Sequence, residues 1–401
     1  MISAEEAWNI VCKEVKDFGT EQIELHRSLH RIVREEVTAD RDFPPYDRVA
    51  MDGIAIRYKE YIQGTTSFHI QGIAAAGAPQ MTCKKPQHCL EVMTGSIMPQ
   101  GLDTVVPYEW IYINEHVADI QKRDVRHLQN IHFKGTDKRK GDMIIPPYTS
   151  ISPAEIGVLA TVGKSRVLVS KLPEICIISS GDELVDIHET PKVYQIRKSN
   201  VSCLNSVLQP FGIAADTYHL PDDLVKSISL LKRLINTYDV ILMSGGISKG
   251  KFDYIPNALD QCGFVKLMDR VAQRPGKPFW FGKHPKGVLV FAFPGNPVSA
   301  LTCMLKYFVP WLKLSMGIEK IDTLYARLST EVHFHPDLTY FPEIRLQSSS
   351  EGVLMASPVK GSGSGDLANL SSIDGFMELP PHRSVFHPGE VYPVFTFRQW
   401  I

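Results

Sequence analysis

The sequence predicts a multidomain protein of the α/β class with additional β-rich parts. Three observations predict this class: alternating strand and helix patterns in the second half of the chain, short strands before them, and a strand-rich segment after them. At 401 residues the chain is long enough for roughly two to four domains. A hydrophobic content of 44% supplies the side chains for several cores.

The composition argues against several classes of protein. The 43 Lys and Arg residues balance the 44 Asp and Glu residues, so we expect no nucleic-acid or membrane partner. The first residues lack the basic and apolar regions of a signal peptide, and no segment is long and apolar enough to span a bilayer. The 7 cysteines follow no zinc-binding spacing. We therefore expect a soluble, cytoplasmic protein.

The first part of the chain predicts an extended, helical linker domain interrupted by a β-rich insertion. Ser3 and Glu6 form the pattern of a capping box, and helical spacing continues in a second run over His30–Val37. A turn-rich segment then opens the insertion, residues 42–139, in which short strands alternate with turns. A helix expected to start at Ser152-Pro153 returns the chain to the linker domain, so this domain comprises residues 1–41 and 140–172.

The region 173–318 has the alternating pattern of an α/β domain and contains two glycine turns. Two apolar runs, Val240–Met243 and Val288–Phe293, have the composition of buried parallel strands. They end at turn-forming residues that allow close approach of the backbone: Ser244, Gly245 and Gly246 in one, and Pro294, Gly295, Asn296 and Pro297 in the other. Exposed N–H groups at such turns bind anions, so we expect an anionic ligand across the strand ends.

A third segment, RPGKP at residues 274–278, lies between these turns in the sequence. Arg274 and Lys277 place two positive charges beside a glycine, where a phosphate or oxyanion can be held. Because Gly and Pro are common in ordinary turns and loops, any one of the three turns alone needs no functional explanation. Their order along one alternating strand–helix region favours a binding site.

Several carboxylates lie at turns, where Asp and Glu are common for reasons of local hydrogen bonding alone. Two of them, Glu183 in SSGDEL and Asp253 in GKFD, follow strand-terminal turns of the same expected sheet. Acids beside phosphate-binding turns hold Mg²⁺ or exchange protons with the substrate. We therefore expect Glu183 and Asp253 near the anion turns, either as ligands of Mg²⁺ or as proton donors and acceptors.

The segment after residue 318 is rich in strands and predicts a small β domain over residues 319–401. The expected strands are Ala326–Phe334, Phe341–Gln347, Gly352–Val359 and Val391–Phe397. GSGSGD at 361–366 has the composition of a loop.

These segments, in this order, resemble the MoeA family of molybdopterin molybdenumtransferases, to which the C-terminal part of gephyrin is similar. The matching segments extend through almost the whole chain. Each segment alone is weak evidence, whereas all of them together, in the order in which the family has them, are specific evidence. They are VAMDGIAI (49–56), MTGSIMPQGLDTVVPYE (93–109), ISPAEIGVLATVG (151–163), ISSGDELV (178–185), SGGISKGKFD (244–253), RPGKPFWFG (274–282), FAFPGNPVSAL (291–301) and SPVKGSGSGDLANLSSIDGFMELP (357–380).

The resemblance implies the last step of molybdenum cofactor synthesis, in which molybdate is inserted into adenylylated molybdopterin and AMP is released. It implies four domains: the linker, which also dimerises, the β-rich insertion, a three-layer molybdopterin-binding α/β domain, and a C-terminal domain like a β-barrel. It further implies a homodimer, with a site where the α/β domain meets the insertion of the other subunit. A pterin adenylyltransferase and molybdoenzymes are the implied protein partners.

The family's functional residues map onto this chain position by position. The implied catalytic acids are Asp52, Asp137, Glu183, Asp253 and Asp223, with Glu183 and Asp253 also as Mg²⁺ ligands. The implied substrate-binding residues are Thr94, Ser244, Gly245, Gly246, Ser248, Arg274, Lys277, Pro294, Gly295, Asn296 and Ser299.

The chain departs from the family pattern at a few positions. Val49 stands where Ser is usual and Ser180 where Thr is usual. Lys249 and Lys251 add positive charge to the SGG loop, where they either tighten oxyanion binding or face solvent.

Two other functions remain open. The chain is alternatively a non-catalytic carrier or scaffold for the cofactor, or a different enzyme on the same α/β module, such as a pterin adenylyltransferase or a nucleotide pyrophosphatase. Molybdate and tungstate, two tetrahedral dianions of nearly equal size, fit the leading prediction equally.

Overall fold

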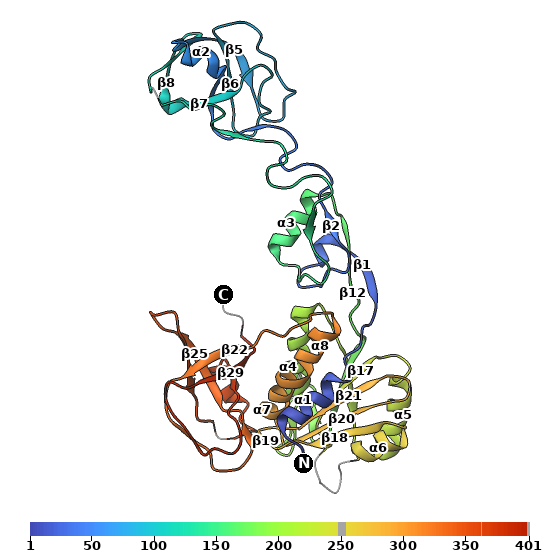
Figure 1. Ribbon diagram of the computed structural model, residues 1–401. Coiled ribbons are helices and arrows are strands. Elements are labelled where there is room, and N and C mark those ends of the chain that lie inside the picture. Colours follow the sequence, from blue (N-terminus) through green and yellow to red (C-terminus); the bar gives the residue numbers. More distant parts are fainter. Residues whose placement is uncertain (123, 248–253, 362, 399–401) are drawn as a thin grey trace. The chain divides into compact units, whose positions relative to one another are not determined.

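The computed structural model describes residues 1–122, 124–247, 254–361 and 363–398, and the chain divides into two compact units (Figure 1). The first unit comprises Met1–Ile23, His30–Arg34 and Leu168–Ile401, and the second comprises Glu24–Leu29 and Glu35–Val167. The boundaries fall within strands β1 (Thr20–Glu24) and β12 (Arg166–Ser170). The two units are described separately below.

A six-stranded sheet forms the centre of the first unit, in the order β16-β13-β17-β21-β20-β18. The first four strands of this order are parallel, and the last two are antiparallel additions at one edge. The strands are β13 (Ile175–Ser180), β16 (Asp216–Leu220), β17 (Val240–Ser244), β18 (Val265–Arg270), β20 (Pro278–Lys283) and β21 (Leu289–Phe293). The two predicted parallel strands are thus confirmed, and because Ser244 lies opposite Phe293 their turns leave the same edge.

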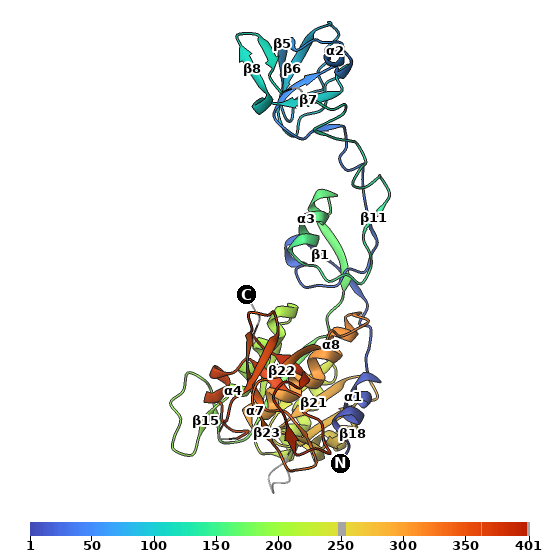
Figure 2. The same ribbon diagram turned by 60° about the vertical axis from the view of Figure 1, so that its left-hand side comes forward.

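Helices cover both faces of this sheet. The helices on one face are α1 (Ala4–Cys12), α4 (Ser199–Leu208), α7 (Pro297–Cys303), the π-helical segment η4 (Met304–Phe308) and α8 (Val309–Ser315); those on the other are α5 (Leu224–Leu234) and α6 (Ile255–Gln261). Successive strand residues alternate between two buried clusters: Ile177 packs with the first set and Ile178 with the second. Helices α4 and α7 lie side by side (Figures 1 and 2). The predicted three-layer α/β arrangement is confirmed.

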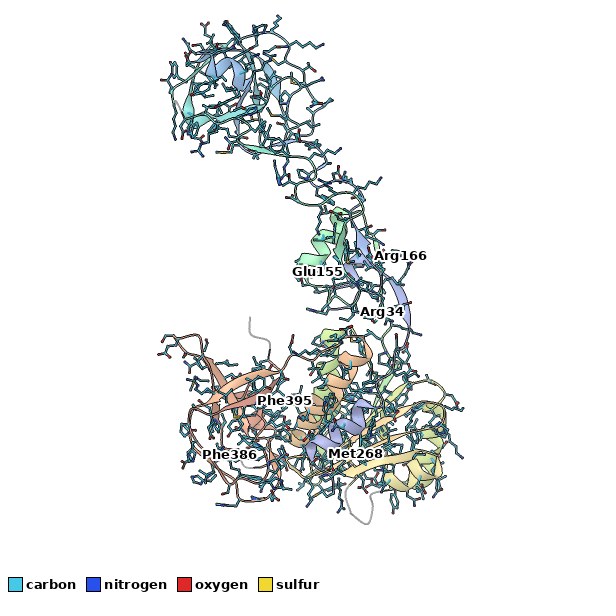
Figure 3. The ribbon with its side chains drawn as sticks, in the orientation of Figure 1. Arg34, Glu155, Arg166, Met268, Phe386 and Phe395 are labelled. Carbon is cyan, nitrogen blue, oxygen red and sulfur yellow. The ribbon has the colours of Figure 1, made fainter. Side chains whose placement is uncertain are left out.

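The C-terminal strands of the first unit close into a barrel in the order β22-β26-β25-β27-β29. These strands are β22 (Leu324–Leu328), β25 (Glu343–Ser348), β26 (Leu354–Pro358), β27 (Gly375–Met377) and β29 (Val391–Thr396). Phe386, labelled in Figure 3, is fully buried in its core, whereas Met268 belongs to the core of the α/β part. The predicted barrel-like domain is therefore confirmed.

One predicted strand of the barrel is wrong in its extent. The segment Ala326–Phe334 forms two strands, β22 and β23 (Val332–His333), because β22 pairs within the barrel while β23 pairs with β28 (Val385–Phe386) in a separate ribbon. The remaining short elements of the first unit are β14 (Leu184–Val185), β15 (Ile196–Arg197), β19 (Gln273–Arg274), β24 (Thr339–Tyr340), η3 (Gln209–Phe211) and η5 (Ala368–Ser372).

The second unit contains the predicted β-rich insertion, whose sheet has the order β7-β4-β6-β5-β9-β8. The elements are β4 (Gly53–Ile56), α2 (Tyr58–Ile62), β5 (Ser67–Ala74), β6 (His88–Val92), β7 (Thr104–Pro107), η2 (Tyr108–Trp110), β8 (Ile111–Asn114) and β9 (Val117–Ile120). Alternate residues of β4 pack on opposite faces of the sheet: Ala55 joins one buried cluster, and Ile54 and Ile56 join the other.

The rest of the second unit consists of one helix, a 3₁₀ turn and short ribbons. The elements are η1 (Leu25–Arg27), β2 (Val37–Thr38), β3 (Arg48–Val49), β10 (Ile131–His132), β11 (Met143–Ile145) and α3 (Pro153–Thr161). Helix α3 starts as predicted with a complete capping box between Ser152 and Glu155, which is labelled in Figure 3.

The helix predicted over His30–Val37 is wrong. His30 has a left-handed φ of 64°, and Val33 forms a β-bridge with Val169. Burial of the apolar residues Ile32 and Val33 in an extended segment therefore outweighs their helical spacing. The N-terminal capping box of Ser3 and Glu6 is present as predicted, and helix α1 packs against the α/β sheet. Among the described residues, no helix combines the length and apolar character needed to cross a bilayer.

Candidate active site

A cavity of about 1170 Å³ lies in the first unit at the carboxyl ends of the parallel strands. Loops after β13, β16, β17 and β21 form part of its wall. The start of α4, the loop after β19 and loops of the barrel also line it. Of the predicted site residues, those that line this cavity are Glu183, Ser244, Gly245, Gly246, Arg274, Lys277, Pro294, Gly295, Asn296 and Ser299. Glu183 and Ser299, 116 positions apart in the sequence, are brought to one cavity in this way because parallel strands end at one edge.

The two glycine turns touch each other at the centre of this wall. The N–H of Gly245 donates to the carbonyl of Phe293 (3.2 Å), and a Cβ on Gly295 would lie 3.6 Å from the Cα of Gly245. At Gly246 φ is +69°, and a Cβ there would lie 2.5 Å from Ile255 Cγ1 and 2.6 Å from Ser180 Oγ. Glycine is therefore required at this turn, which brings bare backbone to the cavity.

Asn200, which the sequence prediction missed, ties the two turns together. Its Nδ2 donates to Ser244 Oγ (2.8 Å) and to the carbonyl oxygen of Gly295 (2.7 Å). Asn200 is the second residue of α4 and lines the same cavity. No motif in the sequence signalled this role.

Ser180 places a hydroxyl group next to the first turn. The residue is 7% exposed and lines the cavity, and in the described part of the chain its Oγ has no hydrogen-bond partner. A buried hydroxyl without a partner costs free energy, about 1–3 kcal/mol. A polar ligand atom that reached Ser180 would remove this cost.

The loop after β19 supplies two positive charges. Strand β19 pairs in parallel with β24, and the N–H of Phe341 donates to the carbonyl of Arg274 (2.8 Å). Arg274 and Lys277 are exposed, line the cavity, and form no ion pair with any carboxylate of the described residues. Both cations are therefore available to an anionic ligand.

The barrel contributes further groups to the cavity. Asn296 Nδ2 donates to Ser364 Oγ (2.9 Å), which joins the second glycine turn to the GSGSGD loop. Glu343 accepts a hydrogen bond from Asn369 Nδ2, and burial raises the pKa of the Glu343 carboxyl above its usual value. Nothing in the alternating strand pattern distinguished Glu343 in the sequence.

The predicted acids of the first unit occupy different positions. Glu183 follows β13 and lines the cavity, and so does Asp222. Asp223 instead caps helix α5, accepting from the N–H of Lys226 (3.1 Å), and this bond lowers the pKa of its carboxyl. Four positions singled out in the sequence lie outside the described residues: Ser248, Lys249, Lys251 and Asp253.

Asp52 and Thr94 come together in the second unit. The Oδ1 atom of Asp52 accepts from the N–H (2.5 Å) and the hydroxyl (2.7 Å) of Thr94, at the end of the segment that precedes β4. These two bonds, led by the backbone one, hold the pKa of the Asp52 carboxyl below its usual value. Neither residue lines the cavity of the first unit.

Asp137 is held by a histidine in the same unit. Arg48 Nη2 contacts His132 Nδ1 (2.9 Å), and His132 Nε2 contacts Asp137 Oδ1 (2.9 Å). Because an arginine only donates, His132 must accept at Nδ1 and donate from Nε2 to the carboxylate. Val49, the departure from the family pattern next to Arg48, is fully buried in the core of this unit.

Comparisons with known proteins agree with this architecture. Three family models match the chain: the MoeA N-terminal region (domain I and II) over residues 2–163, a probable molybdopterin binding domain over 176–314, and the MoeA C-terminal region (domain IV) over 325–397. A molybdopterin molybdenumtransferase of Synechocystis is 38% identical, covering 99% of this chain and 100% of that protein. One of Bacillus subtilis is 28% identical, covering 99% of this chain and 94% of that protein.

Solved structures show the same fold. A crystal structure of a molybdopterin biosynthesis MoeA protein from Pyrococcus horikoshii aligns over 100% of both chains with a TM-score of 0.81 and 25% sequence identity. A second structure of that protein covers 99% of this chain, again with a TM-score of 0.81, at 23% identity. With matches to its N-terminal, central and C-terminal regions and a relative 38% identical over its length, the chain belongs to the MoeA family.

Proposed function

We propose that this protein is a molybdopterin molybdenumtransferase, which inserts molybdate into adenylylated molybdopterin and releases AMP in the final step of molybdenum cofactor biosynthesis. One observation carries the proposal: two touching glycine turns and the Arg274–Lys277 loop face a single cavity, together with the carboxylate of Glu183. The names of full-length relatives support the same activity.

The first task of the site is to bind two anions, the oxyanion and the pyrophosphate linkage of the nucleotide. Arg274 and Lys277 offset this negative charge, and the bare backbone of the glycine turns admits phosphate oxygens closely. The same charges stabilise the charge that develops as the P–O bond of the anhydride breaks and AMP leaves. Water supplies the oxygen atom and proton that complete the two phosphate products.

The second task is proton transfer. Each oxo group that a thiolate sulfur replaces takes up two protons and leaves as water. Glu183 lies on the cavity wall beside the turns, in a position to pass protons from the pterin thiols to the oxo groups. The two dithiolene thiols supply two protons, enough to remove one oxo group as water. The two protons for a second oxo group come from solvent, through the same carboxylate.

The proposal includes Mg²⁺ bound near the phosphates. Glu183 and Asp222 both line the cavity, and carboxylate oxygens are the hard donors that Mg²⁺ takes in proteins. Mg²⁺ held there would offset negative charge on the anhydride. Asp253 is the other ligand predicted from the sequence.

We also propose a homodimer in which the second unit of the partner subunit contributes Asp52, Thr94 and Asp137 to the reaction. The lowered pKa of Asp52 suits a carboxylate that stays ionised while it accepts protons transiently. A cytoplasmic location fits the free thiols of all 7 cysteines. A pterin adenylyltransferase and molybdoenzymes are the proposed donor and acceptor partners.

The test is an insertion assay with adenylylated molybdopterin, Mg²⁺ and molybdate or tungstate, in which AMP release and reconstitution of an apo-molybdoenzyme are followed together. We expect AMP release that depends on the oxyanion. The variant Glu183→Gln should lose on the order of 100-fold or more in rate, since it removes a proton-transferring group. The matched control, Glu189→Gln, changes the same charge on the loop after β14 without touching the cavity and should retain the wild-type rate.

Two results would contradict the proposal. Tight binding of the pterin nucleotide without AMP release would indicate a carrier or scaffold. AMP formation from ATP in the absence of pterin would indicate another enzyme on the α/β module. A wild-type rate for folded Glu183→Gln would remove this residue from the mechanism.

A further inference from the structure

A buried polar network lies behind the loop that carries Arg274 and Lys277. Gln273 is fully buried, and its Nε2 lies 3.2 Å from the carbonyl oxygen of Pro275 and 3.3 Å from that of Gly276. Because carbonyl oxygens only accept, the amide nitrogen of Gln273 must face them and its Oε1 must face away. The side chain of Gln273 thus hydrogen-bonds to the backbone of this loop on its buried side.

Tyr307 fixes the other end of this amide. Its hydroxyl donates to Gln273 Oε1, and its side chain is fully buried. Burial holds the pKa of Tyr307 well above its usual range, so the hydroxyl keeps its proton and remains a donor. The carbonyl oxygens of Pro275 and Gly276 already exclude the flipped orientation of the Gln273 amide, so Tyr307 donates to Oε1.

The backbone that presents Tyr307 is unusual. Tyr307 belongs to η4, one turn of π-helix between α7 and α8, and such turns are rare and frequent at functional sites. The same segment contributes no side chain to the cavity wall. The altered helix geometry is therefore associated with the contact to Gln273 rather than with direct ligand binding.

The loop rests directly on this network. Gly276 has φ +88°, and a Cβ on it would lie 2.6 Å from Cys303 Sγ and 2.7 Å from Gln273 Nε2. With no side chain between the loop and the network, a shift of the Gln273 amide moves the backbone between Arg274 and Lys277.

We propose that Gln273 and Tyr307 are positioning residues that hold the Arg274–Lys277 loop, and through it both cations, in the arrangement that binds the oxyanion. The inference rests on the proposed function for the identity of the anion. Directional hydrogen bonds in a buried network select one loop conformation, whereas an apolar contact of the same volume would allow several. Neither side chain needs to touch the substrate for this role.

The variant Tyr307→Phe tests the proposal because it keeps the ring and removes only the donor. We expect the Kd for tungstate, measured by calorimetry, and the KM for molybdate to rise on the order of 10-fold, as for one lost buried hydrogen bond. The kcat at saturating molybdate should fall as well, because the displaced cations also stabilise the charge that develops as AMP leaves. Gln273→Met should have a similar effect, and adding Tyr307→Phe to it should cause little further loss.

The matched control is Phe308→Leu in the same π-helical segment. The ring of Phe308 packs against those of Phe291 and Trp311, so its truncation should lower the melting temperature with no change in the Kd for tungstate.

The outcomes separate this inference from the proposed function. An unchanged Kd in folded Tyr307→Phe, or an equal rise in Phe308→Leu, would overturn the positioning role. Tungstate binding that weakens in Tyr307→Phe in a protein that never releases AMP would support the positioning role and contradict the transferase. A wild-type protein that binds no tungstate would contradict both.

Discussion

At the scale of single residues, neighbouring carboxylates in one turn have different environments. Asp222 lines the cavity, whereas Asp223 caps a helix. The sequence does not separate these two adjacent acids, because their partners come from the packed structure. Asp52 differs again, since its ionised form is stabilised by two donors from Thr94.

The Asp52 pair gives a prediction about pKa. Thr94→Val removes the hydroxyl donor but keeps the backbone one, so the pKa of Asp52 should rise toward its ordinary value while remaining below it. Carboxyl ¹³C chemical shifts followed through a pH titration measure this directly. Thr94→Ser, which retains a hydroxyl, should titrate like the wild type, and an unchanged pKa in Thr94→Val would show that the hydroxyl bond is unimportant.

The direction of the associated stability change follows from linkage. Because the pKa of Asp52 is lowered in the folded state, the ionised carboxylate stabilises the folded state at pH values above its usual pKa. This contribution disappears as the pH falls through the lower, folded-state pKa. In Thr94→Val the folded-state pKa of Asp52 lies closer to its usual value, so its ionisation should change the free energy of unfolding over a narrower range of acidic pH. The pH dependence of the free energy of unfolding at higher pH should not change.

At the scale of elements, the strand-terminal turns determine where the backbone meets the ligand. The turn after β17 needs glycine for two separate reasons, the positive φ of Gly246 and the closeness of Ile255 and Ser180. Gly212, at the end of η3, has a similar φ of +78°, but a Cβ there would meet nothing within 4 Å. A comparison of substitutions at Gly212 and Gly246 therefore separates the cost of backbone strain, present at both, from the cost of steric clash, present only at Gly246.

This contrast predicts two different costs. Gly212→Ala should lower the free energy of unfolding by about 1–2 kcal/mol, the cost of a left-handed conformation. Gly246→Ala carries the same strain and adds overpacking, so we expect a total loss of roughly 2–5 kcal/mol together with weaker tungstate binding. Urea denaturation and calorimetry provide the two measurements, and equal losses in the two variants would show that Ser180 and Ile255 yield without cost.

At the scale of the whole molecule, the two units have separate hydrophobic cores. Ile54 is fully buried in a cluster drawn only from the insertion, and Leu242 in a cluster of the α/β part. Units with their own cores can unfold independently. The site residues that the family resemblance implies lie in both units, so under the proposed function we expect catalysis to require both units to be folded.

Calorimetry should therefore resolve two unfolding transitions. Ile54→Ala, a large-to-small core change that costs about 2–5 kcal/mol, should lower the temperature of only one transition. Leu242→Ala should lower only the other. A single transition shifted equally by both variants would show that the chain unfolds as one cooperative unit.

The sequence by itself determined the α/β class, the β-rich insertion, the parallel strands, the glycine turns and the helix caps, because these depend on local propensity and on the periodicity of apolar residues. Only the tertiary structure decided which side chains share the cavity. Asn200, Ser180, Glu343 and the Gln273–Tyr307 pair acquire their roles from partners that are 30 or more positions away in the chain in most cases. The misassigned helix at His30–Val37 has the same origin, since pairing with Val169 outweighs local spacing. Burial and hydrogen-bond geometry depend on the packed neighbours, and no local pattern encodes them.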